Sequence, residues 1–478
     1  MLNFNKQLKF SFFTGIYNVV VPKDHLLRKI EENIDFSFVN KLMVRCYCVA
    51  FGRPAYEPEL MLKILFLKLL YDLSDREVIS RCQTDMAFKF FLGLDPEDEV
   101  PDASLLAKFR TLRITEEELQ EFPKETVRQA LNNNIIKSKT IIVDSTHSRS
   151  KHTPQTPTQI LREMTKNLRK EIHRTQNEIS NIFPEKPSVE DDIFEEIDYT
   201  KALVFALEKV EIKSEKAQKL LAKVQKTLEL PNLVELQSAN DEDAKIGHKS
   251  EDNDFFGYKN HIAITEEGII TGLTVTNGTA ADNKELENIV NQTLENGVEV
   301  EDAAGDKAYS TSDILKFGID KNINIISKLK ENVGSKEFSD EYVAFNKDAD
   351  TYECKNGCLA KKHKTRKNGS IEYSFYRNDC EKCPFAQKCI SNRSDGYKRV
   401  LQNVNHELFE KHRKFEETEY FKEKCKIRWK IEQRNSHLKN LYGLDKTYGT
   451  GLWSMKVQSF LTAMTANIVK ITKLAVAT

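Results

Sequence analysis

The sequence predicts a mixed α/β protein in which one sheet is covered by helices and interrupted by insertions. Three observations lead to this fold class. Residues 1 to about 130 carry apolar side chains at helical spacing, strand-like and helical runs alternate between about 139 and 330, and long helical stretches close the chain. With 478 residues, the chain is expected to hold several domains or one core with large insertions.

Bulk composition fits a globular protein of the cytoplasm. Hydrophobic residues make up 40% and charged residues 30%, and no run approaches the roughly 18 apolar residues that cross a bilayer. The first residues, MLNFNKQLKFSFFTG, lack the apolar core of a secretory signal. We therefore expect no membrane span. The net charge of -1 does not indicate nucleic-acid binding, but Lys and Arg outnumber Asp and Glu two to one from Lys355 to Asn440.

The N-terminal region is expected to be helical. Pro58–Leu73 has apolar residues at helical spacing, and Ser74–Cys82 opens on a Ser cap with Glu77 three residues later. Two short helices at a tight joint suggest a helix-turn-helix-like module. Apolar periodicity fits a plain helical bundle equally well, so both interpretations stay open.

The middle of the chain alternates strands and helices. The run KTIIVDSTHS reads as a buried strand whose apolar part ends in Asp144. Two long charged helices follow within residues 157 to 228 and predict a helical hairpin. Gly257–Gly278 predicts a strand pair that turns at EEG. VEVEDAAGDKAYST then reads as a strand leading to Asp306 and a turn, and NINIISK as one more strand.

One acid stands out in the basic run RWKIEQRNSHLK. Glu432 is its only carboxylate, and on a helix it shares a face with Arg428 and Lys439. Local ion pairs of this kind contribute about 0.3–0.5 kcal/mol, which explains the arrangement weakly. A divalent metal explains it better, because Glu432 would help hold the ion while the flanking cations grip phosphate.

Two further acids complete such a site. Asp144 and Asp306 each end an apolar strand-like run, where a rigid sheet holds a carboxylate steady. Magnesium prefers oxygen ligands, and three acids suffice for two metals about 3.5–4 Å apart that act on a phosphodiester. The alternative is that each Asp forms a turn or caps a helix.

These motifs resemble those of DDE transposases from bacterial insertion sequences. VDSTH around Asp144, GDKAYS around Asp306 and the R-x3-E-x6-K run match the three acidic motifs of the group with a Y-x2-R-x3-E-x6-K signature. FGYKNHIAI, VTNGTAADN, SDREVISRC and PDASLLAKFR resemble its connecting motifs and its N-terminal helical domain. The likeness covers most of residues 40 to 450, and the branch it resembles is the family numbered eleven-eighty-two.

The resemblance implies an RNase H-like core that cuts at element ends and joins the freed 3′-hydroxyl to target DNA. Asp144, Asp306 and Glu432 would be the catalytic ligands of Mg²⁺ or Mn²⁺. Arg428 and Lys439 would contact phosphate of double-stranded DNA near the cut, with Lys430 and Arg434 of the same run as further candidates. Paired element ends imply a homodimer on DNA.

One departure from the signature supports an alternative function. The signature tyrosine falls on Cys425, and a thiol neither stacks nor donates a hydrogen bond as a phenol does. The alternative is a catalytically inactive, transposase-derived DNA-binding protein.

Five cysteines between residues 331 and 400 predict a structural zinc site. Cys354-x3-Cys358 and Cys380-x2-Cys383 have the paired spacing of a tetrahedral thiolate site, and Cys389 follows. Spacing alone favours Cys358 over Cys389 as the fourth ligand. Resemblance to family members instead favours Cys354, Cys380, Cys383 and Cys389, with Cys358 as the alternative.

These expectations divide the chain into four parts. A helical DNA-binding domain covers residues 1–130, and an RNase H-like catalytic core covers 131–330 with a helical insertion at 150–235. The Cys-rich zinc-binding insertion covers 331–400, and helices that return to the catalytic core cover 401–478.

Overall fold

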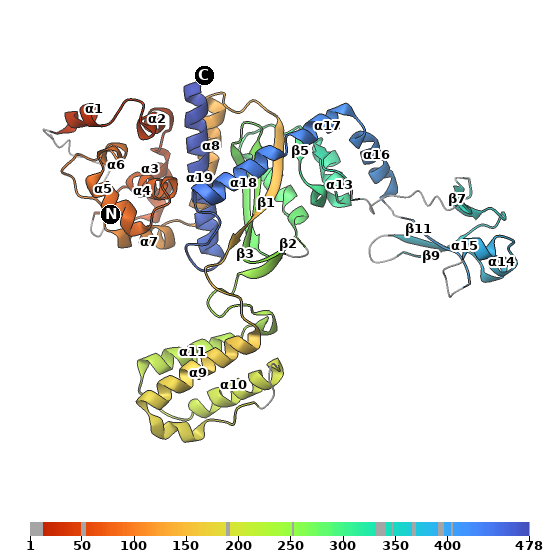
Figure 1. Ribbon diagram of the computed structural model, residues 1–478, viewed down its shortest axis with the longest axis horizontal. Helices are drawn as coiled ribbons and strands as arrows, with labels where there is room; N and C mark the ends of the chain where they lie inside the picture. Colours follow the sequence, from red (N-terminus) through yellow and green to blue (C-terminus); the bar gives the residue numbers. More distant parts are fainter. Residues whose placement is uncertain are drawn as a thin grey trace. The chain divides into compact units, whose positions relative to one another are not determined.

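The computed structural model contains two compact units. It describes residues 13–48, 54–187, 192–250, 253–330, 341–346, 348–365, 370–390, 396–402 and 405–477. Unit 1 comprises Met1–Ser138, Asp144–Glu299 and Lys430–Thr478, and unit 2 comprises Lys139–Val143 and Val300–Trp429. Figure 1 shows the ribbon coloured along the sequence.

Unit 1 begins with a cluster of helices, as the apolar periodicity predicts. Helix α4 lies at its centre, because residues on all its sides are buried. The predicted start of α5 is confirmed, since Ser74 and Glu77 form a reciprocal capping box. The helices are η1 (Thr14–Ile16), α1 (Tyr17–Val20), α2 (Leu26–Asn33), α3 (Phe38–Met43), η2 (Val44–Cys46), α4 (Pro58–Leu70), α5 (Asp75–Thr84), α6 (Met86–Phe91), α7 (Ala103–Leu112) and α8 (Glu116–Asn132).

The sheet of unit 1 is antiparallel. Strand β3 (Asn253–Thr265) pairs with β2 (Lys245–Ser250) and β4 (Ile270–Asn277), which confirms the predicted strand pair. The turn between β3 and β4 contains Gly268 at a φ of 86°, a value that favours glycine. The second half of β1 (Thr140–Arg149) extends this sheet beside β3.

Three helices pack on this sheet. Helix α8, α12 (Leu286–Glu295, preceded by η5, Asp282–Lys284) and α19 (Leu452–Ala477) all contact β4. Figure 1 shows α8 and α19 side by side, and both helices bury apolar side chains there. Within the described part of the chain, no helix combines the length and apolar character that spanning a bilayer requires.

The insertion after β1 is a bundle of three helices, so the predicted hairpin is wrong. It comprises α9 (Pro157–Thr175), η3 (Asn177–Ile182), α10 (Ile193–Leu207), α11 (Glu215–Leu228) and η4 (Leu233–Glu235). Figure 1 shows the three long helices side by side. The expected second helix breaks after Leu207, where Ile212 enters the core and the Ser214 hydroxyl caps α11 by accepting from the Ala217 amide. At the base, the Gln155 amide donates to the Gln237 carbonyl at 2.8 Å.

Unit 2 contains a short parallel sheet. The first half of β1 pairs with β5 (Asp302–Ala304), and β5 pairs with β6 (Asn324–Ile326), both in parallel. Ile142 lies opposite Ala304 in this register. The elements after β5 are η6 (Lys307–Tyr309), α13 (Ser312–Lys321), α16 (His406–Glu416) and α17 (Glu419–Lys426). Helix α18 (Trp429–Leu441) starts at the last residue of unit 2 and continues in unit 1.

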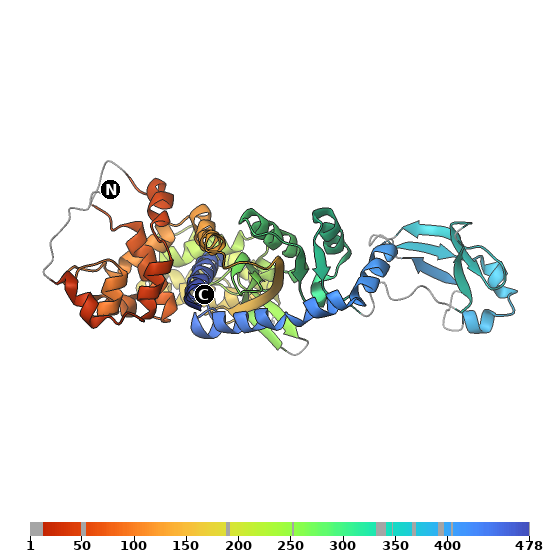
Figure 2. The same cartoon turned by 90° about the horizontal axis from the view of Figure 1, so that it is seen from above.

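The Cys-rich segment has two small antiparallel sheets and its own apolar cluster. Tyr352, Tyr373 and Val400 are buried in that cluster. Figure 2 shows the strands of the larger sheet side by side. The elements are β7 (Val343–Asn346), β8 (Thr351–Cys354), β9 (Lys361–Thr365), β10 (Ile371–Ser374), α14 (Arg377–Glu381), α15 (Ala386–Cys389) and β11 (Arg399–Gln402).

Together these elements make a mixed α/β fold with helices flanking the strands, as the sequence predicts.

Candidate functional site

Asp144 lies within a strand rather than at its end. The apolar run Thr140–Val143 is buried and β1 continues to Arg149, so the strand expected within KTIIVDSTHS is confirmed, while Asp144 ends only its apolar part. The reason is that the polar residues after Asp144 also make strand contacts. Thr146 and Ser148, for example, are buried and bonded to the side chain of Asn260.

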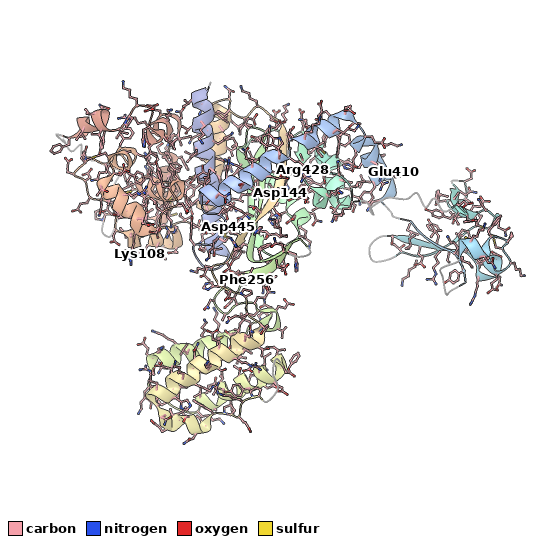
Figure 3. The ribbon with its side chains drawn as sticks, in the orientation of Figure 1. Lys108, Asp144, Phe256, Glu410, Arg428 and Asp445 are labelled. Carbon is pink, nitrogen blue, oxygen red and sulfur yellow. The ribbon has the colours of Figure 1, made fainter. Side chains whose placement is uncertain are left out.

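Helix α18 contacts Asp144 through an asparagine. Nδ2 of Asn435 donates to Oδ2 of Asp144 at 2.9 Å. Asn435 is buried and Glu432 is exposed one turn earlier, at a spacing that puts both residues on neighbouring positions of one helix surface. Figure 3 labels Asp144 on β1, where α18 crosses it. This bond therefore brings the helix turn that carries Glu432 to the strand that carries Asp144.

A second contact joins the same helix and strand. Nζ of Lys439 lies 3.4 Å from both ring nitrogens of His147. The His147 ring stacks on Phe255, with ring centroids 4.6 Å apart. Burial, together with the charge of Lys439, lowers the pKa of His147 to about 4. Burial also lowers the pKa of Lys439, against the opposing effect of Asp445. His147 is therefore a neutral ring at ordinary pH and can face the Lys439 cation.

Asn435 and His147 were not among the predicted site residues. The signal for Asn435 was present in the sequence, because it stands three residues after Glu432 on the predicted helix. His147 belongs to the VDSTH motif, but pairing it with Lys439 requires knowing how α18 crosses β1.

In unit 2, Asp306 follows β5, as the sequence predicts. Its Oδ1 accepts from the Ala308 amide at 2.9 Å and so caps η6. Its carbonyl oxygen accepts from the Ser327 hydroxyl, which lies just after β6. The capping interpretation and the metal-ligand interpretation are compatible, because a capping bond orients the carboxylate.

The basic residues of the RWKIEQRNSHLK run have different environments. Arg428 and Lys439 are half-buried, and Lys430 pairs with Glu266 in the β3–β4 turn at 3.4 Å. Arg434 is only 8% exposed, and its Nη2 donates to Asn467 of α19 at 3.5 Å. Burial lowers the pKa of Arg434 to about 10. Because its guanidinium is enclosed between helices, a role in holding α18 on α19 fits Arg434 better than a phosphate contact.

Cys425, at the position of the signature tyrosine, sits against an apolar cluster. It packs on Ala304, Ile326 and Phe421 in unit 2. Burial raises the pKa of its thiol, against the opposing effect of Lys328 and Arg428. This environment suits a neutral thiol.

Cysteines of the Cys-rich segment interact with one another. The pKa of Cys358 is raised by burial and by Cys354 and Cys383, and that of Cys380 is raised by burial and by the same two thiols. This is the group that spacing alone favours. Nevertheless, among the described residues no group of three or more His, Cys, Asp or Glu side chains is arranged to hold a metal ion. This applies to the five cysteines and equally to Asp144, Asp306 and Glu432, so both metal sites remain predictions from the sequence.

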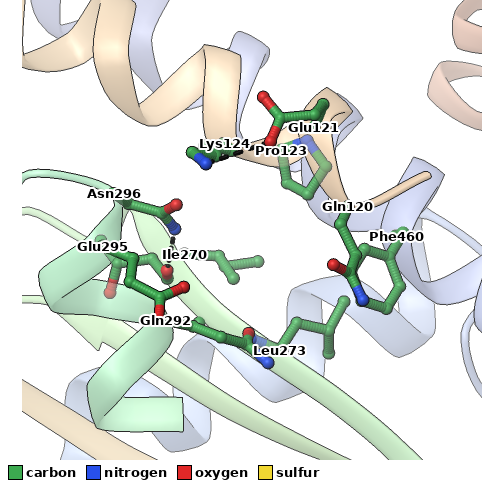
Figure 4. Close-up of a pocket in the computed structure, with 12 residues that line it drawn as sticks. Gln120, Glu121, Pro123, Lys124, Ile270, Leu273, Gln292, Glu295, Asn296 and Phe460 are labelled. Atoms are coloured by element: carbon green, nitrogen blue, oxygen red, sulfur yellow. Dashed lines mark hydrogen bonds and ion pairs between the residues drawn. The ribbon is translucent and has the colours of Figure 1, made fainter. Parts of the chain in front are cut away.

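A small cavity in unit 1 contains none of the predicted site residues. It has a volume of about 70 Å³ and lies among α8, β4, α12 and α19 (Figure 4). Two of its polar side chains hold α12 on β4, since Asn296 donates to the Thr271 carbonyl and Gln292 accepts from the Leu273 amide. We interpret this cavity as a packing feature.

Comparison with known proteins finds transposase domains in two parts of the chain. Residues 16–112 match the model of the Transposase domain (DUF772), and residues 217–468 match that of the Transposase DDE domain. The second range covers more than half of the 478 residues and contains Asp306 and Glu432, whereas Asp144 lies outside both ranges.

One curated protein of Rhizobium meliloti, "Uncharacterized protein ORF8 in nfe locus", is 39% identical over 82 residues. The aligned part is 17% of this chain and 39% of that protein, so the chain spans well under two thirds of the relative. No solved structure matches the chain.

Proposed function

The chain belongs to the transposase DDE domain family, and from this premise we propose that it cuts double-stranded DNA at the ends of an insertion sequence and transfers the freed 3′-hydroxyl into target DNA. In the first step, water attacks the phosphorus and the bond to the 3′ oxygen breaks. In the second step, the released 3′-hydroxyl attacks a target phosphodiester. We further propose that the core is RNase H-like and that two copies assemble on paired ends in the cytoplasm.

The proposed catalytic residues are Asp144, Asp306 and Glu432, which would hold Mg²⁺ or Mn²⁺. The observation that carries this proposal is the strand register of unit 2. Ile142 lies opposite Ala304, and each Asp follows its strand residue by two positions along the chain. Because β1 and β5 pair in parallel, the chain leaves the paired residues in the same direction on both strands, and this register supports the proposal that the two acids act together.

Hydrogen bonds to two of the three acids support this proposal. Carboxylates that bind metal ions are usually oriented by a second hydrogen bond, and Asn435 supplies one to Asp144 while the Ala308 amide supplies one to Asp306. When bound, divalent ions would activate the attacking oxygen and stabilise the leaving oxygen. Lys439, held beside His147, would neutralise phosphate near the cut, with Arg428 and Lys430.

We also propose that the Cys-rich segment binds zinc through Cys354, Cys380 and Cys383. Either Cys389 or Cys358 would be the fourth ligand. Cys354 and Cys383 raise the pKa of Cys358 as they raise that of Cys380, which supports Cys358. Zinc would stabilise a segment whose apolar cluster is small.

The test uses a labelled duplex that carries an element end, with magnesium. Wild-type protein is expected to nick the end and to yield joined products with a target duplex. Glu432→Gln should abolish both while DNA binding persists. The matched control is Gln433→Glu, which replaces an amide by a carboxylate at the next exposed position of α18. Cleavage that survives in Glu432→Gln would refute the assignment.

The alternative, an inactive DNA-binding descendant, rests on Cys425 alone. Because Cys425 packs on apolar side chains, its thiol is compatible with an intact fold around the site. We therefore retain the active transposase as the proposed function.

A further inference from the structure

The three-helix insertion carries its charges unevenly. Helices α9 and α11 together have nine Lys and Arg against three Glu, whereas α10 has three acids and one Lys. The bundle is held by its own apolar core, which includes Leu161, Leu168, Leu203 and Val224. The outer charges are therefore not needed to hold the three helices together.

The exposed cations of α11 form one row. Lys216, Lys219, Lys223 and Lys226 are all exposed, and their spacing of three and four residues keeps them on one side of the helix. At a rise of 1.5 Å per residue the row extends roughly 15 Å.

Helix α9 contributes a second row. Lys166, Lys170 and Arg174 are exposed and follow one another at intervals of four residues. Arg162 and Arg169 point elsewhere, because Arg162 pairs with Glu196 of α10 at 2.9 Å and Arg169 lies over the Tyr199 ring of α10.

The two rows meet at a buried carboxylate. Glu171 accepts from Arg174 at 2.7 Å and pairs with Lys216 at 3.2 Å, although its own side chain is only 6% exposed. This bridge fixes α9 beside α11 and joins the rows into one surface. We define this surface as the basic face, which consists of Lys166, Lys170, Arg174, Lys216, Lys219, Lys223 and Lys226.

Most cations of the basic face are not neutralised locally. An ordinary solvated helix alternates Glu and Lys four residues apart, and only Lys219 follows that pattern on α11, with Glu215 at 2.5 Å. Among the described residues, no carboxylate pairs with Lys166, Lys170, Lys223 or Lys226.

We propose that the basic face of the insertion binds the phosphate backbone of double-stranded DNA without reading its sequence. Duplex DNA carries one negative charge per about 1.7 Å of axis, so a row of about 15 Å meets several phosphates. Long lysine side chains suit this contact because they act as flexible point charges. The proposal rests on the proposed function only in taking DNA as the partner, since it assigns the insertion no part in cleavage.

The test compares two charge-matched variants of the full chain. The first replaces Lys219, Lys223 and Lys226 by Gln, which leaves Lys216 with Glu171. The control replaces Lys186, Lys201 and Lys209 by Gln, which removes the same charge from other exposed parts of the insertion. The readout is the equilibrium binding of a random-sequence duplex, followed by fluorescence anisotropy between about 50 and 200 mM salt.

The first variant should bind about tenfold more weakly at the lower salt concentration, and its log–log salt slope should fall by about 2–3. The control should stay within about twofold of wild type, and Lys→Arg at the same three positions should restore binding. Circular dichroism should show equal melting for all proteins.

Equal binding by the two Gln variants would overturn the proposal. It would also be overturned if the first variant bound DNA normally but lost self-association, because the basic face would then contact acidic α10 of a second copy. Glu432→Gln distinguishes failure of this proposal from failure of the proposed function. This variant should lose cleavage but keep the full salt dependence of duplex binding.

Discussion

Asn435 holds Asp144 by a hydrogen bond of 2.9 Å from its Nδ2 to Oδ2. The two residues are far apart in the sequence, and the bond fixes how the β1 carboxylate is oriented toward the helix of Glu432. If Asp144 holds the metal as proposed, this bond should raise metal affinity, because hydrogen bonds that orient a ligand typically contribute about 10–100-fold.

Asn435→Ala should therefore reduce end cleavage about 10–100-fold at limiting magnesium. Raising the metal concentration should recover part of the rate, because the loss lies in metal affinity. Ser436→Ala changes the next, exposed residue of α18 and should leave the rate within about twofold. A cleavage rate of Asn435→Ala equal to that of wild type at every magnesium concentration would contradict this role.

His147 should make the folded protein sensitive to acid. Its pKa is about 4 when folded and about 6.5 when unfolded, so the unfolded chain binds more protons between these values. The contribution of His147 to the free energy of unfolding is thus present above pH 6.5 and is lost as the pH falls toward 4. Urea unfolding of wild type and His147→Gln over this range should show a smaller pH dependence for the variant. An equal pH dependence of the free energy of unfolding in both proteins would refute this role of His147.

Asp302 should be a major stabilising residue of unit 2. It is 1% exposed and accepts from Thr140, Asn324 and Tyr420, while Lys424 lies 3.1 Å away. Asp302→Ala leaves these buried donors and the cation without their acceptor, at a cost of about 3 kcal/mol or more.

Denaturant unfolding measures this loss. The matched control is Glu301→Ala, because Glu301 is the neighbouring acid but is exposed and pairs only at the surface with Lys139. Its loss should cost less than about 1 kcal/mol. Similar losses for both variants would show that the Asp302 network contributes little.

Cys425 should tolerate a small apolar replacement. Because its side chain packs on Phe421 and its neighbours, Cys425→Ala removes the sulfur of a half-buried residue and should cost about 1–2 kcal/mol. End cleavage should stay within about threefold of wild type at a temperature where the fold is intact. A complete loss of cleavage in a folded Cys425→Ala protein would instead indicate that the thiol has a catalytic role.

The two candidate fourth ligands can be separated by metal content. If Cys358 completes the proposed zinc site, Cys358→Ser should lower the zinc bound per chain and Cys389→Ser should leave it unchanged. Elemental analysis of the purified proteins gives the ratio. A loss of zinc in Cys389→Ser but not in Cys358→Ser would favour Cys389 as the fourth ligand. Wild-type protein purified without bound zinc would refute the proposed zinc site.

Local signals were sufficient to predict many of the elements. The Ser74 capping box, the β3–β4 pair and the turn after β5 all depend on neighbouring residues, and all are confirmed. The same holds for the mixed α/β class, because hydrophobic periodicity depends on the nearest few residues.

Errors arose where distant parts of the chain decide the outcome. The sequence showed Arg434 as one cation of a basic run, but α19 encloses it. The bonds that Asn260 of β3 makes to Thr146 and Ser148, beyond Asp144, likewise join residues distant in the sequence. The expected second helix of the insertion divides into α10 and α11 because the Ser214 side chain caps α11. This cap was missed because Ser214 stands in a run of charged residues.

The hydrogen bond between Gln155 and Gln237 at the base of the insertion bears on how the insertion can be changed. The chain leaves and returns at adjacent points, and the bundle between them has its own core. A few residues would be enough to join the two points at the base, so the whole insertion can be exchanged as one unit. Lengthening, replacing or deleting this segment should therefore leave the pairing of the strands on either side unchanged.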